Sequence, residues 1–363
     1  MRTSTALSLG GFLIGIGTGW YLFTSLDVSS TVFAWFLMIV GMSIVASSLL
    51  SWKHFHIPLQ GLVGSLSAGL LLSLFITSGF GFLQDIVGIG ILPYRAEGVK
   101  SYGGSVTVDK VYLQVDNFNG AVHVSTWDRS EFSLNLTIVA RGYSQSDAED
   151  MLKELKIGFS ESVVQGQKRL TLQYDVSSLR RSRYSIEVHA ALPAKAIIDL
   201  DLRSSNGGIY LGKLREGVLK METSNGPLVF EEVYAESLTG QTSNGRIEGR
   251  AEAKMALLYT SNGRIDLTIP CTVSGSYDLR TSNSNVDLRV SSSTQIGYDL
   301  DLSTSNGGIT INLSGLSYSR NQQTSKKAQT EGFNSKAVQV TIKATTSNGS
   351  ILVDAPRSGQ IQT

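Results

Sequence analysis

The chain of 363 residues carries 31 basic and 30 acidic side chains, which leaves a formal charge of +1. This balance excludes the strongly basic composition of a protein that binds nucleic acid through its charge, and we expect no nucleic-acid partner. The single cysteine, Cys271, excludes a disulfide framework and a cysteine-based metal cluster. We expect it to be a buried, inert thiol rather than a nucleophile.

The first 97 residues differ from the rest of the chain because they hold very few charges. Three apolar runs of about the length that spans a bilayer lie here. They are Ala6–Leu26, Thr31–Leu50 and Leu62–Ile86. Residues 1–97 are therefore predicted to be a three-helix transmembrane anchor, with the lipid bilayer as a partner. A cleaved signal peptide is the alternative for the first run.

The short loops between these runs predict the orientation. The loop after the first run contains Asp27, whereas the loop after the second contains Lys53, His54 and His56. The positive-inside rule places the N-terminus in the cytoplasm and everything after the third run outside. This predicts a multi-pass cell-membrane protein with an extracellular C-terminal part. We assign the two loop histidines to the headgroup interface; a metal site is the alternative.

Residues 98–192 are predicted to be a β-rich capping region with one short helix. The alternation predicts strands at Val106–Val115, Ala121–Ser125, Glu131–Val139, Arg169–Tyr174 and Tyr184–Ala190. The sequence Ser146-Asp-Ala-Glu149 resembles a capping box that opens the helix. The cluster Arg180, Arg181 and Arg183 is interpreted as a solvated loop, with contact to anionic headgroups as the alternative.

A short polar motif, T-S-N-G, recurs from residue 193 onward. Successive copies are 18 to 23 residues apart, except for a last interval of 42, and a looser copy is centred on Asn119. The central asparagines are Asn206, Asn225, Asn244, Asn262, Asn283, Asn306 and Asn348. A fixed period near 20 residues is typical of a solenoid. We predict a β-solenoid over 193–355, a polar insertion at 317–335 and a disordered tail at 356–363.

Alternation on both sides of the motif predicts one strand before it and one after it. Inward pairs in the second strand are Ile209/Leu211, Leu228/Phe230, Ile265/Leu267, Val286/Leu288, Ile309/Ile311 and Ile351/Val353. We expect Asn-Gly to supply the positive φ of a sharp corner, with Asn and Thr facing inward in stacked ladders and Ser outward. The fold class is all-β: a parallel β-solenoid of about 20-residue coils, preceded by a β-rich cap and three transmembrane helices.

The outward positions of the second strands form a charged column. Glu248, Asp266 and Asp287 are expected to stack on consecutive coils, with Arg246 and Arg264 two residues upstream. A compensated surface charge ladder is one interpretation; contact with a saccharide or a divalent cation is the other. No nucleophile motif or phosphate-binding loop accompanies the column. We predict no catalytic residue, no metal site and no cofactor.

The segments "VDNFNGAVHVSTWD" and "ALPAKAIIDLDLRSSNGGI", together with the serial T-S-N-G-x-I units, resemble the "putative adhesin" domain family of bacteria and archaea. The resemblance covers Val111–Val353. It implies a right-handed β-solenoid-like fold, frequent membrane attachment and no catalytic residues. Three predicted membrane spans go beyond the minimal pattern of that family.

Three functions remain open on these grounds. The first is a non-catalytic, membrane-anchored module displayed on the cell surface for adhesion or structure, with a surface glycan or an envelope protein as partner. The second is an envelope-stress sensor or regulator that acts through a membrane partner. The third, a polysaccharide-active enzyme, has fold analogy as its only support.

Overall fold

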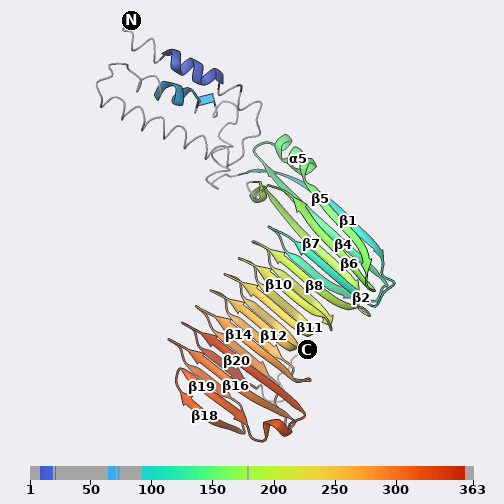
Figure 1. Cartoon of the computed structure of the whole chain (residues 1–363), viewed down its shortest axis with the longest axis vertical. Helices are drawn as coiled ribbons and strands as arrows, with labels where there is room; N and C mark the ends of the chain where they lie inside the picture. The colour runs from blue at the N-terminus through green and yellow to red at the C-terminus, as the bar shows by residue number, and fades with distance from the viewer. Residues whose placement is uncertain are drawn as a thin grey trace, which may run out of the picture. The chain divides into compact units, whose positions relative to one another are not determined.

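A computed structural model of the chain describes residues 9–18, 21, 64–70, 72–73, 92–177 and 180–355 (Figure 1). It divides into two compact units, residues 1–93 with 177–182, and residues 94–176 with 183–363. Of the predicted membrane spans, Thr31–Leu50 lies wholly outside the described residues and the other two lie partly outside them. Among the residues described, no helix has the length and apolar character needed to cross a bilayer. The predicted tail at 356–363 also lies outside this range.

Two helical segments of the first unit, residues 9–18 and 64–70, approach each other at glycines. A Cβ atom on Gly15 would lie 2.3 Å from the carbonyl oxygen of Leu66, and one on Gly69 would lie 2.2 Å from that of Phe12. No side chain fits at either position, so the two backbones are in direct contact. Small residues permit this close packing between helices in membranes.

The second unit is mainly β and its sheet is largely parallel, with solenoid-like repeats (Figure 1). Each coil has a strand before the S-N-G corner and a strand after it, and stacking the coils forms a pre-corner face and a post-corner face. The strands of the coils are β2 (Lys110–Asp116), β3 (Val122–Trp127), β6 (Gln167–Asp175), β7 (Tyr184–Pro193), β8 (Ile197–Ser204), β9 (Ile209–Arg215), β10 (Val218–Thr223), β11 (Leu228–Thr242), β12 (Ile247–Thr260), β13 (Ile265–Ile269), β14 (Gly275–Thr281), β15 (Val286–Val290), β16 (Ile296–Thr304), β17 (Ile309–Asn312), β20 (Val338–Thr346) and β21 (Ile351–Asp354).

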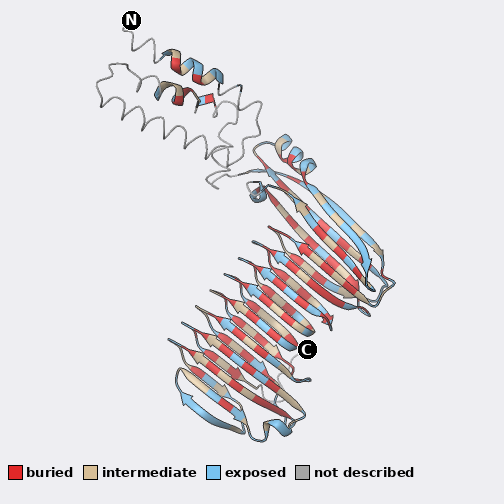
Figure 2. Cartoon of the chain, viewed as in Figure 1, coloured by how far each residue is buried: buried red, intermediate tan, exposed pale blue. Residues whose placement is uncertain are grey.

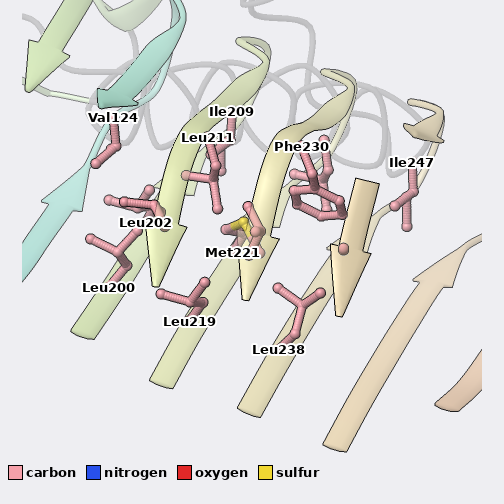
Figure 3. Close-up of a cluster of buried hydrophobic side chains, with 14 of the residues drawn as sticks. Val124, Leu200, Leu202, Ile209, Leu211, Leu219, Met221, Phe230, Leu238 and Ile247 are labelled. Carbon is pink, nitrogen blue, oxygen red and sulfur yellow. The ribbon is translucent and has the colours of Figure 1, made fainter. Parts of the chain in front are cut away.

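The core lies between the two faces, and buried residues alternate with less buried ones along most strands (Figure 2). Leu200, Leu219 and Leu238 occupy the same register position on neighbouring strands, and all three are buried (Figure 3). The expected inward pairs of the second strands are buried as well, except that Ile311 is half-buried. Burying a side chain of this size stabilises the fold by about 1.5–3 kcal/mol.

Each corner is held by the threonine of its motif. The Thr242 hydroxyl accepts a hydrogen bond from the Gly245 N–H at 3.1 Å and donates one to the Gly226 carbonyl of the preceding coil at 3.0 Å. Thr223, Thr260, Thr304 and Thr346 make the equivalent pair of contacts, and Thr281 donates to the Gly263 carbonyl. These buried hydroxyls therefore satisfy backbone groups that water cannot reach.

The asparagines form a hydrogen-bonded ladder, but it lies on the surface. Each Nδ2 from Asn206 through to Asn306 donates to the Oδ1 of the neighbouring coil's asparagine at 2.6–2.7 Å, and Asn119 is the first acceptor. The expectation that Asn faces inward is therefore wrong, because the asparagines of the T-S-N-G motifs are exposed. The two-residue period does not continue through the corner, where the backbone turns and both Ser and Asn point to solvent.

The reason for glycine in the motif also differs from the expectation. Neither Asn244 nor Gly245 has a positive φ. Instead, a Cβ atom on Gly245 would lie 1.8 Å from the Gly226 carbonyl oxygen of the neighbouring coil. Glycine is required here by the close approach of successive corners, and not by a left-handed backbone.

The coils do not stack in chain order at either end. The ladder runs from Asn283 to Asn348 and then to Asn306, so the last coil of the chain lies inside the stack. In agreement, β20 pairs with β14 and β16, and β21 pairs with β15 and β17. At the other end, β2 lies between β6 and β8, and β3 between β7 and β9. The first and last coils of the chain are each enclosed by two neighbours.

Antiparallel strands cover both faces at the N-terminal end of the stack and the pre-corner face at the C-terminal end. At the N-terminal end, β4 (Glu131–Gly142) pairs with β7, β1 (Tyr94–Ser105) with β4, and β5 (Lys156–Val164) with β6. At the C-terminal end, the predicted polar insertion forms a hairpin of β18 (Leu316–Gln322) and β19 (Ser325–Thr330), and β19 pairs with β16; the short helix η2 (Phe333–Ser335) follows. Such closing strands protect edges that would otherwise pair with other chains.

The helix α5 (Gln145–Glu154) begins two residues earlier than the sequence predicts. Its N-cap is Ser144, whose hydroxyl accepts a hydrogen bond from the Asp147 N–H at 3.1 Å. Asp147 in turn binds the guanidinium of Arg183, which ends the short helix η1 (Arg181–Arg183) and is buried. Arg183 is thus a structural residue of the cap, and its assignment to a solvated loop is wrong.

Candidate functional site

A single outward row crosses the post-corner face. The strand register places His189, His123 and Tyr210 side by side, and farther along Glu248, Asp266 and Asp287 side by side. The rule that side chains alternate between the two sides of a strand points all of them away from the core. We call this set the post-corner row; it has an aromatic part and a charged part.

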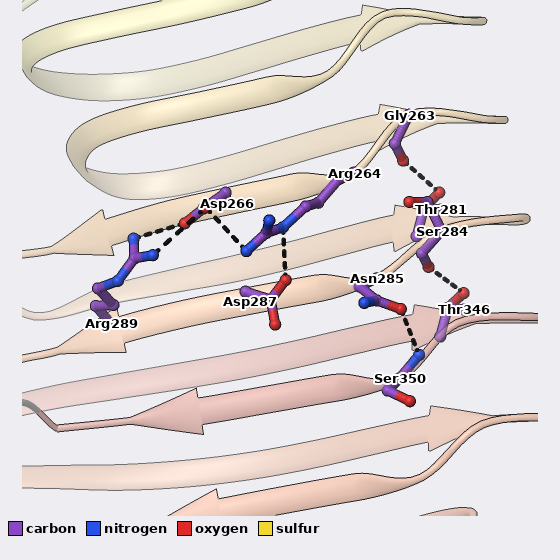
Figure 4. Close-up of polar contacts among 10 residues, drawn as sticks. All are labelled: Gly263, Arg264, Asp266, Thr281, Ser284, Asn285, Asp287, Arg289, Thr346 and Ser350. Atoms are coloured by element: carbon purple, nitrogen blue, oxygen red, sulfur yellow. Dashed lines mark hydrogen bonds and ion pairs between the residues drawn. The ribbon is translucent and has the colours of Figure 1, made fainter.

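The charged part contains the residues that the sequence singles out, and the structure brings them together; Figure 4 shows Arg264, Asp266 and Asp287. Arg246 contacts Glu248 at 2.7 Å. Arg264 bridges two coils: Nε lies 2.7 Å from Asp287 Oδ2, and Nη2 lies 3.1 Å from Asp266 Oδ2. The stacked carboxylates are therefore each compensated by an arginine, as parallel rows of like charge require.

One member of this network, Arg289, was not predicted from the sequence. Its Nη1 lies 2.6 Å from Asp266 Oδ1 and its Nη2 lies 3.4 Å from Asp266 Oδ2. The position two residues after Asp287 on the same strand was a signal for it, since both side chains must share one face. With Arg289, each carboxylate of the charged part is engaged by arginine.

The aromatic part is a stack of flat rings. The His123 and His189 rings have centroids 4.6 Å apart and an interplanar angle of 3°, and His123 stacks on Tyr210 at 4.6 Å and 8°. Glu187 lies beside the stack: its Oε1 is 2.9 Å from His189 Nε2 and 3.4 Å from His123 Nε2. Burial lowers the pKa of His123, the charge of His189 lowers it further, and Glu187 opposes both effects.

This histidine cluster was not predicted from the sequence either, although the strands that carry it were. His123 lies at an outward position of the predicted strand Ala121–Ser125, and Glu187 and His189 at outward positions of Tyr184–Ala190. The missing fact was the pairing of β3 with β7, which are separated by the cap. No repeat motif marks that pairing.

Cys271 lies away from the row and is buried. Its φ of 56° is left-handed, and the Tyr298 hydroxyl donates a hydrogen bond to its Sγ atom at 3.4 Å. Burial raises the pKa of the thiol. The thiol is therefore a poor nucleophile, because the thiolate is the reactive form.

No protein-family model and no curated protein matches the chain. Among solved structures, a "putative cell adhesion protein" from Clostridium sporogenes is similar with 12% identity, a TM-score of 0.33, and coverage of 71% of this chain and 100% of that one. A "putative adhesin" from Bacteroides fragilis gives 10% identity, a TM-score of 0.35, and coverage of 73% and 100%. A "putative lipid binding protein" from Parabacteroides distasonis gives 12% identity, a TM-score of 0.33, and coverage of 71% and 97%. Similarity at this level does not identify the role of the chain, which must be argued from its own residues.

Proposed function

We propose that the chain is a non-catalytic binding module that is anchored in a membrane and displays its stack of coils on the cell surface for adhesion. The observation that carries the proposal is the post-corner row: stacked rings and ion-paired arginines lie along one outward row of the same face. Tyrosine and arginine are enriched in protein interfaces because they offer apolar area together with hydrogen-bond donors. Arg246 and Arg264 keep 60% and 50% of their side-chain surface exposed although they are paired.

The anchor rests on the first unit. The apolar runs of residues 1–97 have spanning length, and the glycine contact between residues 9–18 and 64–70 is of the kind that helices use in lipid. The short loops supply the orientation. In this arrangement the partner is a surface glycan or an envelope protein that meets the post-corner face.

Display can be tested with the chain's only cysteine as an internal control. Cys271 is 3% exposed, so the wild-type chain should resist a membrane-impermeant maleimide, whereas a Lys220→Cys variant carries an exposed thiol. We expect intact cells or spheroplasts that carry the variant to be labelled as strongly as lysed ones. Labelling only after lysis would place the coils on the inner side of the membrane and end the proposal.

Adhesion can be tested by comparing the two faces. Cells that display the full chain should be retained on immobilised glycans or envelope proteins. The double variant Tyr210→Ala/Arg264→Ala should lose retention, whereas Tyr259→Ala/Arg280→Ala, a neighbouring Tyr/Arg pair on the pre-corner face, should keep it. Equal loss in both variants contradicts a role for the post-corner row. If neither the wild type nor the variants are retained and a membrane protein co-purifies instead, the result favours an envelope-stress sensor or regulator that acts through that membrane partner.

A further inference from the structure

We propose that His123, His189 and Glu187 form a binding site for a divalent transition-metal ion of the zinc class. This inference goes beyond the proposed function, because it concerns the chain's own metal chemistry and holds whether or not the chain is displayed. It rests on the convergence of three potential ligands from two paired strands. Nothing in the T-S-N-G repeat contributes to it.

The first argument is distance. One ligand atom from each of the three residues lies within 4.8 Å of the other two. Zinc held by nitrogen and oxygen at about 2.0–2.2 Å in a tetrahedron requires about 3.3 Å between ligands. The two distances from Glu187 Oε1 to the imidazole Nε2 atoms, 2.9 and 3.4 Å, are already close to this value.

The second argument is the placement of the ligands on the sheet. Glu187 and His189 are two residues apart on β7, so they share its outward face, and His123 is the direct partner of His189 on β3. This gives three donors at adjacent points of a rigid parallel sheet. A metal requires the histidine rings to leave their parallel stacking, which is a rotation about a soft side-chain torsion.

The third argument is the type of donor. Two imidazoles and one carboxylate suit zinc, and this ligand set is found in zinc sites that keep a fourth position for water or an incoming group. The side chains of His123, Glu187 and His189 are 35%, 47% and 51% exposed, so the fourth position faces solvent. A carboxylate or imidazole of a partner could occupy it.

The test is zinc binding by the full-length chain, purified in detergent, stripped with a chelator and titrated against a chromophoric zinc indicator. The chain has four histidines, and the other two, His54 and His56, are a competing pair. We expect one equivalent of zinc, unchanged affinity in His54→Ala/His56→Ala, and affinity weaker by about tenfold or more in His123→Ala or His189→Ala. Glu187→Gln should also weaken binding, whereas Tyr210→Phe, which keeps the ring stack, should not.

Two outcomes overturn the proposal: no zinc binding by the wild type, or a loss of binding only in His54→Ala/His56→Ala. Circular dichroism and the unfolding midpoint show whether the histidine variants remain folded. If the histidine variants are not folded, the His54→Ala/His56→Ala chain is used instead, because its His123, Glu187 and His189 are unchanged. Electron paramagnetic resonance with Cu²⁺ should then show coupling to imidazole nitrogen, and its absence rejects the site.

Discussion

The two ends of the coil stack solve the same problem in different ways. Both must cover strand edges, and both enclose the first or last coil of the chain between two neighbours. At the N-terminal end, β4 alternates buried and exposed residues along its length, and α5 packs nearby. At the C-terminal end, β18 has no buried residue and β19 has only Ala328.

This difference separates two tasks of a closing strand. Hydrogen bonding along an edge prevents pairing with another chain, and a polar hairpin is sufficient for that. Stabilising the end requires apolar burial as well, which β4 contributes through residues such as Phe132 and Leu134. The N-terminal end is therefore expected to be the stable one, and the C-terminal end to depend on its enclosed coil.

The largest expected effect comes from deleting residues 337–363, which removes β20 and β21. Val340, Ile342, Ala344, Ile351 and Val353 are all buried there, so the loss should be on the order of 10 kcal/mol. Hydrogen exchange should show loss of protection across Ile296–Thr330. Deleting only residues 356–363 is the control and should leave protection unchanged. Protection retained at Ile296–Thr330 would mean that the Asn306 coil can dock on β14 and β15 without β20.

A second experiment compares one aromatic residue from each closing element. Phe132 of β4 is 1% exposed, so Phe132→Ala should lower the free energy of unfolding by about 3–5 kcal/mol. Tyr318 of β18 is 39% exposed, so Tyr318→Ala should cost about 0.5 kcal/mol. Denaturant unfolding of the full chain measures both. Similar losses would show that the hairpin supports its end as strongly as β4 does.

The corner threonines allow a coil in the middle of the stack to be compared with the outermost coil at the C-terminal end. Thr242→Val leaves the Gly245 N–H and the Gly226 carbonyl without their partner and should cost about 1–3 kcal/mol. Thr304 in the outermost coil is 8% exposed, so water can replace part of what Thr304→Val removes, and the cost should be smaller. Thr242→Ser keeps the hydroxyl and should recover most of the stability. A larger effect at Thr304 would contradict the picture of a loose C-terminal end.

Among the corner residues, the smallest effect is expected on the asparagine ladder. Asn244→Ala removes hydrogen bonds to Asn225 and Asn262, but water can reach these groups, so the cost should be about 1 kcal/mol or less. Ser243→Ala changes the exposed neighbour in the same corner and serves as the control. Thermal unfolding midpoints compare them. A loss greater than that of Thr242→Val would make the surface ladder, and not the buried hydroxyl, the main support of the corner.

The coil itself could be predicted from the sequence because its signals are local. Alternation on either side of Asn244 or Asn262 defines two strands, and the inward residues follow from it. The charged column was predictable for the same reason, since one register relates Glu248, Asp266 and Asp287.

The order of the coils could not be predicted, because it is not a local property. The motifs at Asn306 and Asn348 are nearly identical, so either could follow Asn283, and only contacts made elsewhere distinguish them. The same limit hid the histidine cluster, since β3 and β7 are brought together by the cap between them. The outward position of Ser was predicted, but that of Asn was missed, because the two-residue period fails at the corner.

The enclosed last coil has a mechanical consequence. A force on the chain beyond Asp354 reaches the stack at β21, which is hydrogen-bonded along both edges, to β15 and to β17. Pulling it out requires two ladders to break, whereas an outermost strand would peel away along one. A tether that carries load through its C-terminus gains rupture strength from this arrangement, without a disulfide and without a larger core.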